Sequence, residues 1–143
     1  MSDGAGARAV VERYLDALNG HDASAAVACV ARDFFNEHTS AIGTSVRGRD
    51  AYAARLPQFL AAFRDLRYEV EDWIVDGDRV AVPYTMTCTV AGEGADPRAV
   101  RIRGMFRFRV EDGVIVHRVD YWDGNEFERQ VQAASSDETA RQP

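Results

Sequence analysis

Apolar residues recur at helical spacing along the first part of the chain and predict a first helix over about residues 5–18. The apolar stripe of this helix consists of Val10, Val11, Tyr14, Leu15 and Leu18. Asn19-Gly20 is a typical helix stop, and Asp22 is a good N-cap for a second, short helix. A third helix is expected from about Asp50 to Phe63, where Pro57 should kink the helix or split it in two.

The pattern changes to alternation of apolar and polar residues in the second half of the chain, which is typical of strands. The expected strands cover residues 34–38, 68–75, 79–90, 101–110 and 114–122. Tight turns are expected at Asp76-Gly77-Asp78 and Asp112-Gly113, and less regular connections at 39–46 and 91–97. Helices followed by an antiparallel sheet indicate an α+β fold. We expect one domain over residues 1–132 and a disordered tail over 133–143.

Two neighbouring strands carry the most informative pattern. On the first, alternation separates Ile102, Gly104, Phe106, Phe108 and Val110 from Arg101, Arg103, Met105, Arg107 and Arg109. On the next, it places on one face Val114, Val116, Arg118, Asp120 and Trp122. An acid on a buried face needs a specific reason, so Asp120 is the main functional candidate. The arginine row predicts a solvated outer face or a dimer surface paired with carboxylates.

Composition narrows the classes of partner. The net charge of -6 argues against nucleic acid, because phosphate binding requires a basic surface. The two cysteines, Cys29 and Cys88, have no metal-ligand spacing, so we expect no metal and no organic cofactor. No signal peptide or apolar membrane span is visible, which favours a cytoplasmic protein without membrane contact.

Three motifs, in this order, resemble the small enzymes of the nuclear transport factor 2-like superfamily. They read VERYLDALNGHD, RDFFNEH and FRFRVEDGVIVHRVDYWD, and the resemblance covers roughly residues 7–131. Its closest matches are ketosteroid isomerase, limonene-1,2-epoxide hydrolase and the SnoaL-like polyketide cyclases. The resemblance implies a cone-shaped α+β barrel, in which a curved antiparallel sheet wraps around the N-terminal helices and a deep hydrophobic pocket. We also expect a homodimer.

The resemblance carries roles over position by position. Tyr14 matches the isomerase tyrosine that donates a hydrogen bond to a developing oxyanion. His38 falls at the isomerase general base, and Gly104 falls where the isomerase has a second, protonated aspartate, so one oxyanion donor is missing. Steroid isomerisation is therefore disfavoured.

The epoxide hydrolase is matched only in part. Asp120 matches its catalytic aspartate, but the partner arginine and second aspartate would fall on Tyr84 and Met86. The tyrosine and asparagine that help hold its nucleophilic water would fall on Asn36 and His38. The SnoaL-like cyclases, which have a histidine and an aspartate in the pocket, are the best fit.

The candidate catalytic residues are His38, Asp120 and Tyr14, and each has a structural alternative. His38 could be a general base with its ordinary pKa of about 6.5, or a cap at the rim. Asp120 could be a base or orient His38, or could pair with an arginine such as Arg118. Tyr14 could be a core tyrosine bonded to the backbone. The candidate substrate-binding residues are Asn36, Phe59, Phe63, Tyr84, Met86, Phe106 and Trp122.

The favoured function is cofactor-independent acid–base chemistry on a hydrophobic carbonyl compound, by isomerisation or intramolecular aldol cyclisation. A non-catalytic module that binds a hydrophobic small molecule is an alternative, and epoxide hydrolysis is a weaker one. The side chains of Tyr14, His38 and Asp120 should point into one cavity if the protein is an enzyme.

Overall fold

The computed structural model describes the backbone of residues 4–91 and 96–141 and the side chains of these residues up to 132. Most of the flexible connection expected over 91–97 lies outside the described residues. The helices are α1 (Gly4–Asn19), α2 (Ala23–Val27), α3 (Arg49–Ala62) and α4 (Gly124–Arg141). Asp22 is the N-cap of α2, as predicted, since its carboxylate accepts a hydrogen bond from the Ala25 amide.

Within the described residues, seven strands form one curved sheet that does not close into a barrel. The strands are β1 (Val30–His38), β2 (Val46–Arg47), β3 (Arg64–Val70), β4 (Ile74–Asp76), β5 (Arg79–Ala91), β6 (Pro97–Glu111) and β7 (Val114–Tyr121). Their order is β2-β1-β7-β6-β5-β3, and β4 pairs with β5. The β1–β7 pair is parallel, so the sheet is mixed, whereas the sequence predicted an antiparallel sheet.

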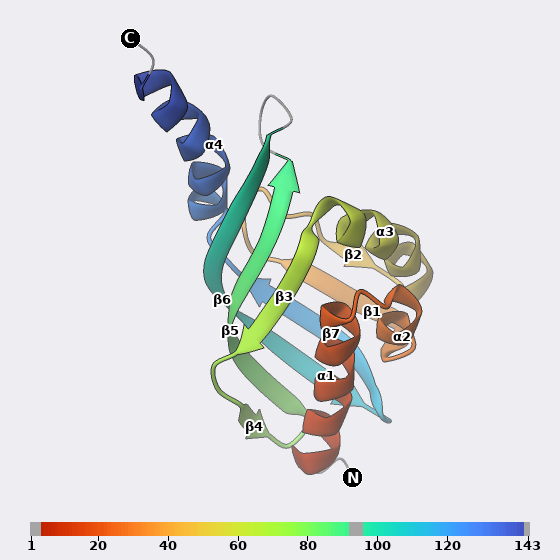
Figure 1. Ribbon diagram of the computed structural model, residues 1–143. Helices are drawn as coiled ribbons and strands as arrows, with labels where there is room; N and C mark the ends of the chain where they lie inside the picture. Colours follow the sequence, from red (N-terminus) through yellow and green to blue (C-terminus); the bar gives the residue numbers. More distant parts are fainter. Residues whose placement is uncertain (1–3, 92–95, 142–143) are drawn as a thin grey trace.

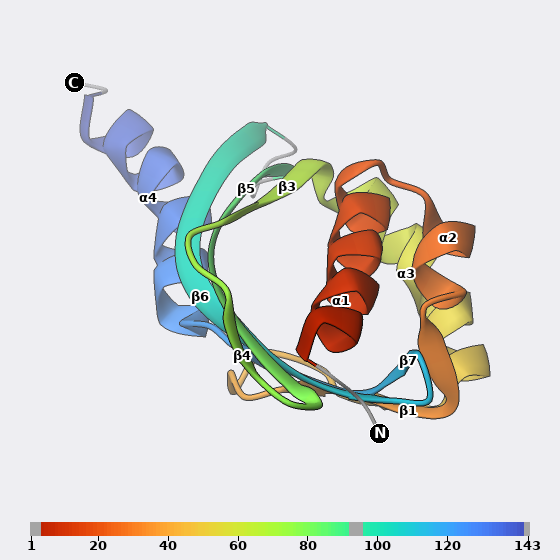
Figure 2. The ribbon, with the colours of Figure 1, turned by 90° about the horizontal axis from the view of Figure 1, so that it is seen from below.

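The sheet curves around α1, and this arrangement creates the core. Figure 2 shows α1 on the concave side of the sheet, with α2 and α3 beyond it. On the other side of β6 lies α4, which Figure 1 shows extending away from the body of the fold. The predicted inward face of β5 is buried throughout, from Val80 to Val90. The α+β cone expected from the resemblance is therefore confirmed.

The helix α3 is not divided at Pro57. Pro57 lies inside α3, which continues through it as one helix, so the predicted split does not occur and the alternative of a kink stays a prediction. Pro57 is exposed, so water can satisfy the carbonyl that loses its helical partner. The helix α4 extends to Arg141. The domain over residues 1–132 and the disordered tail over 133–143 stay predictions.

The predicted face of β7 was wrong at its beginning. The register shifts between Arg109 and Val110, so that Val116 is an extra residue on β7. Ile115 consequently occupies the core in place of Val114 and Val116, which are only partly buried. Beyond this bulge the prediction holds, since Arg118 and Asp120 both point to the buried side.

Candidate functional site

A cavity of about 280 Å³ lies where the end of β1 and the middle of β7 face α3. Its lining consists of Leu18, Asn36, His38, Thr44, Val46, Tyr52, Arg55, Leu56, Gln58, Phe59 and Arg118. The buried members, such as Asn36, Tyr52 and Arg118, form the floor, whereas the exposed Arg55 and Gln58 lie at the mouth. The volume is at the small end of the roughly 300–1,000 Å³ typical of small-molecule sites.

The parallel pairing of β1 with β7 assembles the polar wall of this cavity. Asn36 lies beside Arg118 and His38 lies beside Asp120 in the register of the two strands. Because side chains two residues apart share a face of a strand, all four belong to the side of the sheet that faces the helices. The site therefore depends on contacts between distant parts of the chain.

Arg118 is a buried charge at the site, with 5% of the residue exposed. Its Nε donates a hydrogen bond to Asn36 Oδ1 at 2.7 Å, and its Nη1 donates to Tyr14 Oη at 3.1 Å. The guanidinium also lies over the Phe106 ring, 4.9 Å from its centroid. Among the described residues, no carboxylate oxygen lies within 4.0 Å of a guanidinium nitrogen of Arg118, so Arg118 forms no ion pair with them.

Asp120 is equally buried, and its environment favours the protonated form. Its Oδ1 accepts a hydrogen bond from Tyr84 Oη at 2.5 Å. Burial raises the pKa of Asp120 to about 6, although Arg118 and the Tyr84 hydrogen bond oppose this rise. The carboxyl group therefore changes charge near neutral pH, in the range useful for proton transfer. The ion pair with Arg118 that was considered as an alternative does not form in the structure.

His38 differs from the prediction in its protonation. Burial, followed by repulsion from Arg118 and Arg55, lowers the pKa of His38 to about 3, so the expectation of an ordinary value was wrong. Its Nδ1 accepts a hydrogen bond from Trp122 Nε1 at 3.0 Å and lies 3.7 Å from Asp120 Oδ2. An indole nitrogen only donates, and this assigns the imidazole proton to Nε2. His38 is thus a neutral group, and its Nε2–H donates to none of the described residues.

Tyr14 lies behind the cavity rather than in its lining. Its hydroxyl is 2.5 Å from that of Tyr52 and accepts the hydrogen bond from Arg118. Burial raises the pKa of Tyr14, so its hydroxyl stays neutral. Tyr52, which sequence reasoning missed, is the member of this pair that reaches the cavity. The catalytic role of Tyr14 stays a prediction.

The predicted substrate-binding residues divide into two groups. Asn36 and Phe59 line the cavity. The others pack around it: Phe63 on Phe59, Met86 in the core, Tyr84 and Phe106 in an aromatic cluster with Tyr68, and Trp122 on His38. Their binding roles stay predictions.

Of the α3 residues that line the cavity, sequence reasoning identified Phe59 and missed Tyr52, Arg55, Leu56 and Gln58. Tyr52, Arg55 and Phe59 recur at helical spacing and lie on one side of this helix, as does Leu56. That spacing was a usable signal. Alternation placed Arg118 on the buried face with Asp120, but its place in the cavity lining depends on the pairing of β7 with β1, which the sequence did not predict.

Gly104, where the isomerase has its second acid, makes room for Tyr84. An added Cβ at Gly104 would lie 2.5 Å from Tyr84 Oη and 2.7 Å from the carbonyl oxygen of Tyr121. Such distances are far below van der Waals contact. The glycine is therefore what allows Tyr84 to reach Asp120, so the position that lacks an acid is filled by a tyrosine hydroxyl.

The described residues were also considered as possible metal ligands and membrane-spanning helices. Among residues 4–91 and 96–132, no group of three or more His, Cys, Asp or Glu side chains is arranged to hold a metal ion. No helix in the described part of the chain has the length and apolar character needed to cross a bilayer.

The curved sheet, the helices on its concave side and the cavity between them define the class of nuclear transport factor 2-like α+β proteins. The model of one family, the SnoaL-like domain, matches residues 11–118. The chain therefore belongs to the SnoaL-like domain family. None of the curated proteins matches the chain.

Solved structures support the fold. A proposed SnoaL-like polyketide cyclase from Shewanella denitrificans is 18% identical, with a TM-score of 0.80 over 89% of this chain and 97% of that one. A proposed polyketide cyclase from Xanthomonas campestris is 27% identical, with a TM-score of 0.76 over 91% and 99%. An epoxide hydrolase of M. tuberculosis, described as LEH-like, is 19% identical, with a TM-score of 0.78 over 97% and 98%.

Proposed function

We propose that this protein is a small-molecule enzyme that moves a proton next to a carbonyl group, without a cofactor, and so isomerises or cyclises a hydrophobic substrate. The observation that carries the proposal is Asp120, a buried carboxyl group whose pKa of about 6 suits a general base. Family membership and the cyclases among the structural neighbours agree with this chemistry.

The proposed reaction begins with Asp120 in its ionised form. The carboxylate accepts a proton from the carbon next to the substrate carbonyl, and the electrons of the C–H bond pass to the carbonyl oxygen as an enolate. Asp120 lies behind His38, and 7% of its side chain is exposed, so the substrate must approach it past the imidazole. Reprotonation at another carbon gives an isomer, and attack of the enolate on a second carbonyl closes a ring.

The cavity wall is suited to the enolate oxygen because it offers hydrogen-bond donors. His38 is neutral with its proton on Nε2, and Asn36 uses its oxygen to accept from Arg118, which leaves its amide N–H groups free. Donors that are fixed before the reaction stabilise a developing oxyanion most effectively. In this proposal, His38 is an electrophile rather than the base.

A single experiment tests the proposal without knowledge of the natural substrate. The α-protons of 2-tetralone are exchanged for deuterium in D₂O, and the exchange is followed by proton NMR. The wild-type protein should accelerate the exchange, with a rate that rises with pH and levels off above about 6, because Asp120 must be ionised. Asp120→Asn should lose about 100-fold or more of the acceleration.

Asp33→Asn is the matched control, because Asp33 is an exposed acid on β1, and its exchange rate should equal that of the wild type. Full activity of Asp120→Asn would show that the base is assigned wrongly. A non-catalytic binding module is the second candidate, and it is favoured by the position of Asp120 and Tyr14 outside the cavity lining. Binding of 2-tetralone without any exchange would support it.

A further inference from the structure

We propose that the ligand of the cavity carries a carboxylate, and that Arg118 on the cavity floor receives this group. The inference depends on the proposed function only in taking the cavity as the ligand site. It concerns the charge of the ligand before any reaction, whereas the proposed function concerns the proton that is moved.

The first argument is the charge of the lining. Arg55 and Arg118 both line the cavity, and no acidic residue is among the described lining residues. The nearest acid to the floor, Asp120, lies behind the lining and gives its Oδ1 to Tyr84. The interior is therefore electropositive, and a low-dielectric cavity strengthens its attraction for an anion.

The second argument is that the guanidinium of Arg118 has unused donors. A guanidinium has five N–H groups, and only two of them donate to described residues, one to Asn36 and one to Tyr14. The third nitrogen, Nη2, donates to none of the described residues. A fully buried nitrogen without a hydrogen-bond partner would count as unsatisfied, and Nη2 of Arg118 is not such an atom. Nη2 is therefore accessible, and it belongs to a residue of the cavity floor.

The third argument is energetic. Burying a charge costs several kcal/mol unless an opposite charge compensates for it. Arg118 has two neutral hydrogen-bond acceptors and the Phe106 ring, but no carboxylate within ion-pair distance among the residues described. Asp120 acts on Arg118 electrostatically but does not contact it as an ion pair. A ligand carboxylate would provide this direct contact, and its two oxygens match the planar fork of a guanidinium.

The rest of the lining indicates the other part of the ligand. Leu18, Val46, Leu56 and Phe59 provide an apolar surface beside the guanidinium. Arg55 is exposed at the mouth and has no ion pair among the described residues, so it can attract the incoming anion from solution. Together with the volume of about 280 Å³, these features specify a small, hydrophobic or aromatic carboxylic acid.

The test compares two probes of the same shape that differ in charge, 2-naphthoate and 2-naphthamide, by isothermal titration calorimetry at pH 7.5. The wild-type protein should bind the carboxylate at least about tenfold more tightly than the amide. Arg118→Met should abolish this preference. Arg118→Lys, which keeps the charge but loses the planar fork, should retain only part of it.

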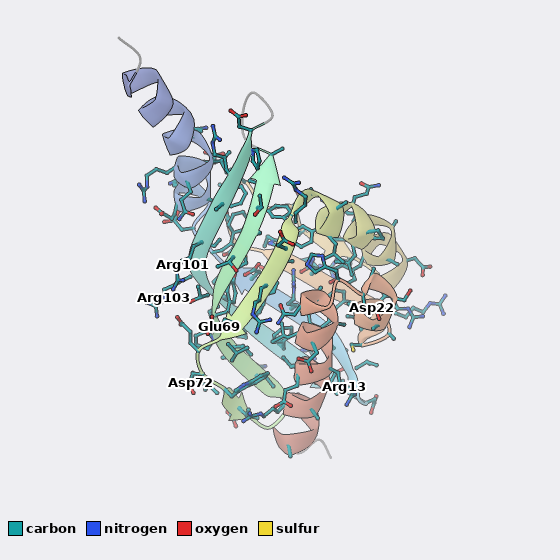
Figure 3. The ribbon with its side chains drawn as sticks, viewed as in Figure 1. Arg13, Asp22, Glu69, Asp72, Arg101 and Arg103 are labelled. Carbon is teal, nitrogen blue, oxygen red and sulfur yellow. The ribbon has the colours of Figure 1, made fainter. Side chains whose placement is uncertain are left out.

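Two other arginines serve as comparisons in the same titrations. Arg55→Gln should weaken binding of the carboxylate a few-fold, and mainly at low salt, because Arg55 is exposed. Arg101→Gln removes an exposed arginine of β6 on the side of the sheet away from α1, α2 and α3 (Figure 3), and should change neither affinity. Circular dichroism checks that each variant is folded. If Arg118→Met does not fold, the inference is still tested by comparing the affinities of the two probes for the wild type and for Arg118→Lys.

Equal affinity of the wild type for naphthoate and naphthamide would overturn the inference, as would a preference that survives in Arg118→Met. Its failure is distinct from failure of the proposed function. Exchange of 2-tetralone without a preference for carboxylate would leave the enzyme proposal standing and reduce Arg118 to a donor for the enolate. A preference for carboxylate without exchange would support the ligand class and remove the proposed reaction.

Discussion

The two faces of the β6–β7 hairpin carry arginines in opposite environments. On the outer face, Arg103 binds both oxygens of Glu71, Arg107 donates to the hydroxyl of Tyr121, and Arg109 pairs with Glu111. On the inner face, Arg118 is buried without a carboxylate partner among the described residues. Exposed ion pairs contribute little, whereas a buried charge without its counterion is costly and indicates a function.

The comparison extends to the acids of the two faces. Hydrogen bonds from Arg103 lower the pKa of Glu71, which stays ionised in solvent, whereas burial raises the pKa of Asp120. The acid that contacts the outer face of the hairpin, Glu71 in the β3–β4 connection, is therefore fixed in charge, whereas Asp120 on the inner face titrates near neutrality. The arginine row is paired with carboxylates in part, as the sequence predicted, and the homodimer expected through this face stays a prediction.

The largest expected effect is from Gly104→Ala, which should break the inner arrangement. The added methyl group would overlap Tyr84 and the backbone of Tyr121, neither of which can move freely, since Tyr84 is bonded to Asp120. Such overpacking should lower the free energy of unfolding by about 3 kcal/mol, measured by urea denaturation. A variant as stable as the wild type would show that Tyr84 is not confined by its neighbours.

An intermediate effect is expected from Asp120→Asn, which should stabilise the fold at neutral pH. The pKa of Asp120 rises from 3.8 to about 6 on folding, so its contribution to stability falls as the pH rises from about 4 to about 6 and then stays low. Asparagine avoids this cost and keeps an acceptor for Tyr84. The shift corresponds to at most about 3 kcal/mol. Burying the amide group of asparagine offsets part of this, so we expect a gain of about 2 kcal/mol at pH 8 that disappears near pH 4, measured by urea denaturation at each pH.

His38 should make the free energy of unfolding change with pH in the opposite direction in the same measurements. Its pKa falls from 6.5 to about 3 on folding, so stability decreases as the pH falls from about 6.5 toward 3. In the wild type, the effects of Asp120 and His38 on the pH dependence of stability partly cancel between about pH 4 and 6. Asp120→Asn should therefore lose stability in acid more steeply than the wild type, and His38→Gln less steeply. Parallel curves for all three proteins would contradict both pKa assignments.

The smallest effect is expected on the outer face, from Arg103→Ala. This substitution lies one residue before Gly104 on β6 and removes an exposed pair with Glu71. Because solvent and salt screen such a pair, the melting temperature should change little, and any change should vanish at high salt. A loss as large as that of Gly104→Ala would show that the two faces do not differ as described.

Local pattern predicted much of the fold. The stripe on α1, the cap at Asp22 and the alternating face of β5 depend on residues close in sequence, and the structure confirms them. The bulge at Val116 was not predicted, because the residues 114–122 alternate regularly and only the pairing with β6 reveals the extra residue. The continuity of α3 through Pro57 was not decided by the sequence, because a proline inside a helical pattern can either kink a helix or end it.

The candidate site was predicted less completely, for a related reason. His38 and Asp120 were identified, but the charge state of His38 depends on burial and on two arginines from β7 and α3. Arg118 was considered only as a partner of Asp120, since its role depends on the parallel strand beside it. The charge state of His38 and the role of Arg118 thus depend on electrostatics and long-range strand pairing, which a local pattern of residues does not reveal.

The parallel pair of β1 and β7 also has a consequence for the order of folding. Asn36 and Arg118 are separated by 82 residues, whereas β6 and β7 are joined by a tight turn. Closing so large a loop costs chain entropy before its contacts form, so the long hairpins can form earlier than the site. A nascent chain that ends before β7 lacks the cavity even if its helices and β5–β6 hairpin are complete. The polar wall of the cavity is therefore complete only after β7 has been added to the sheet.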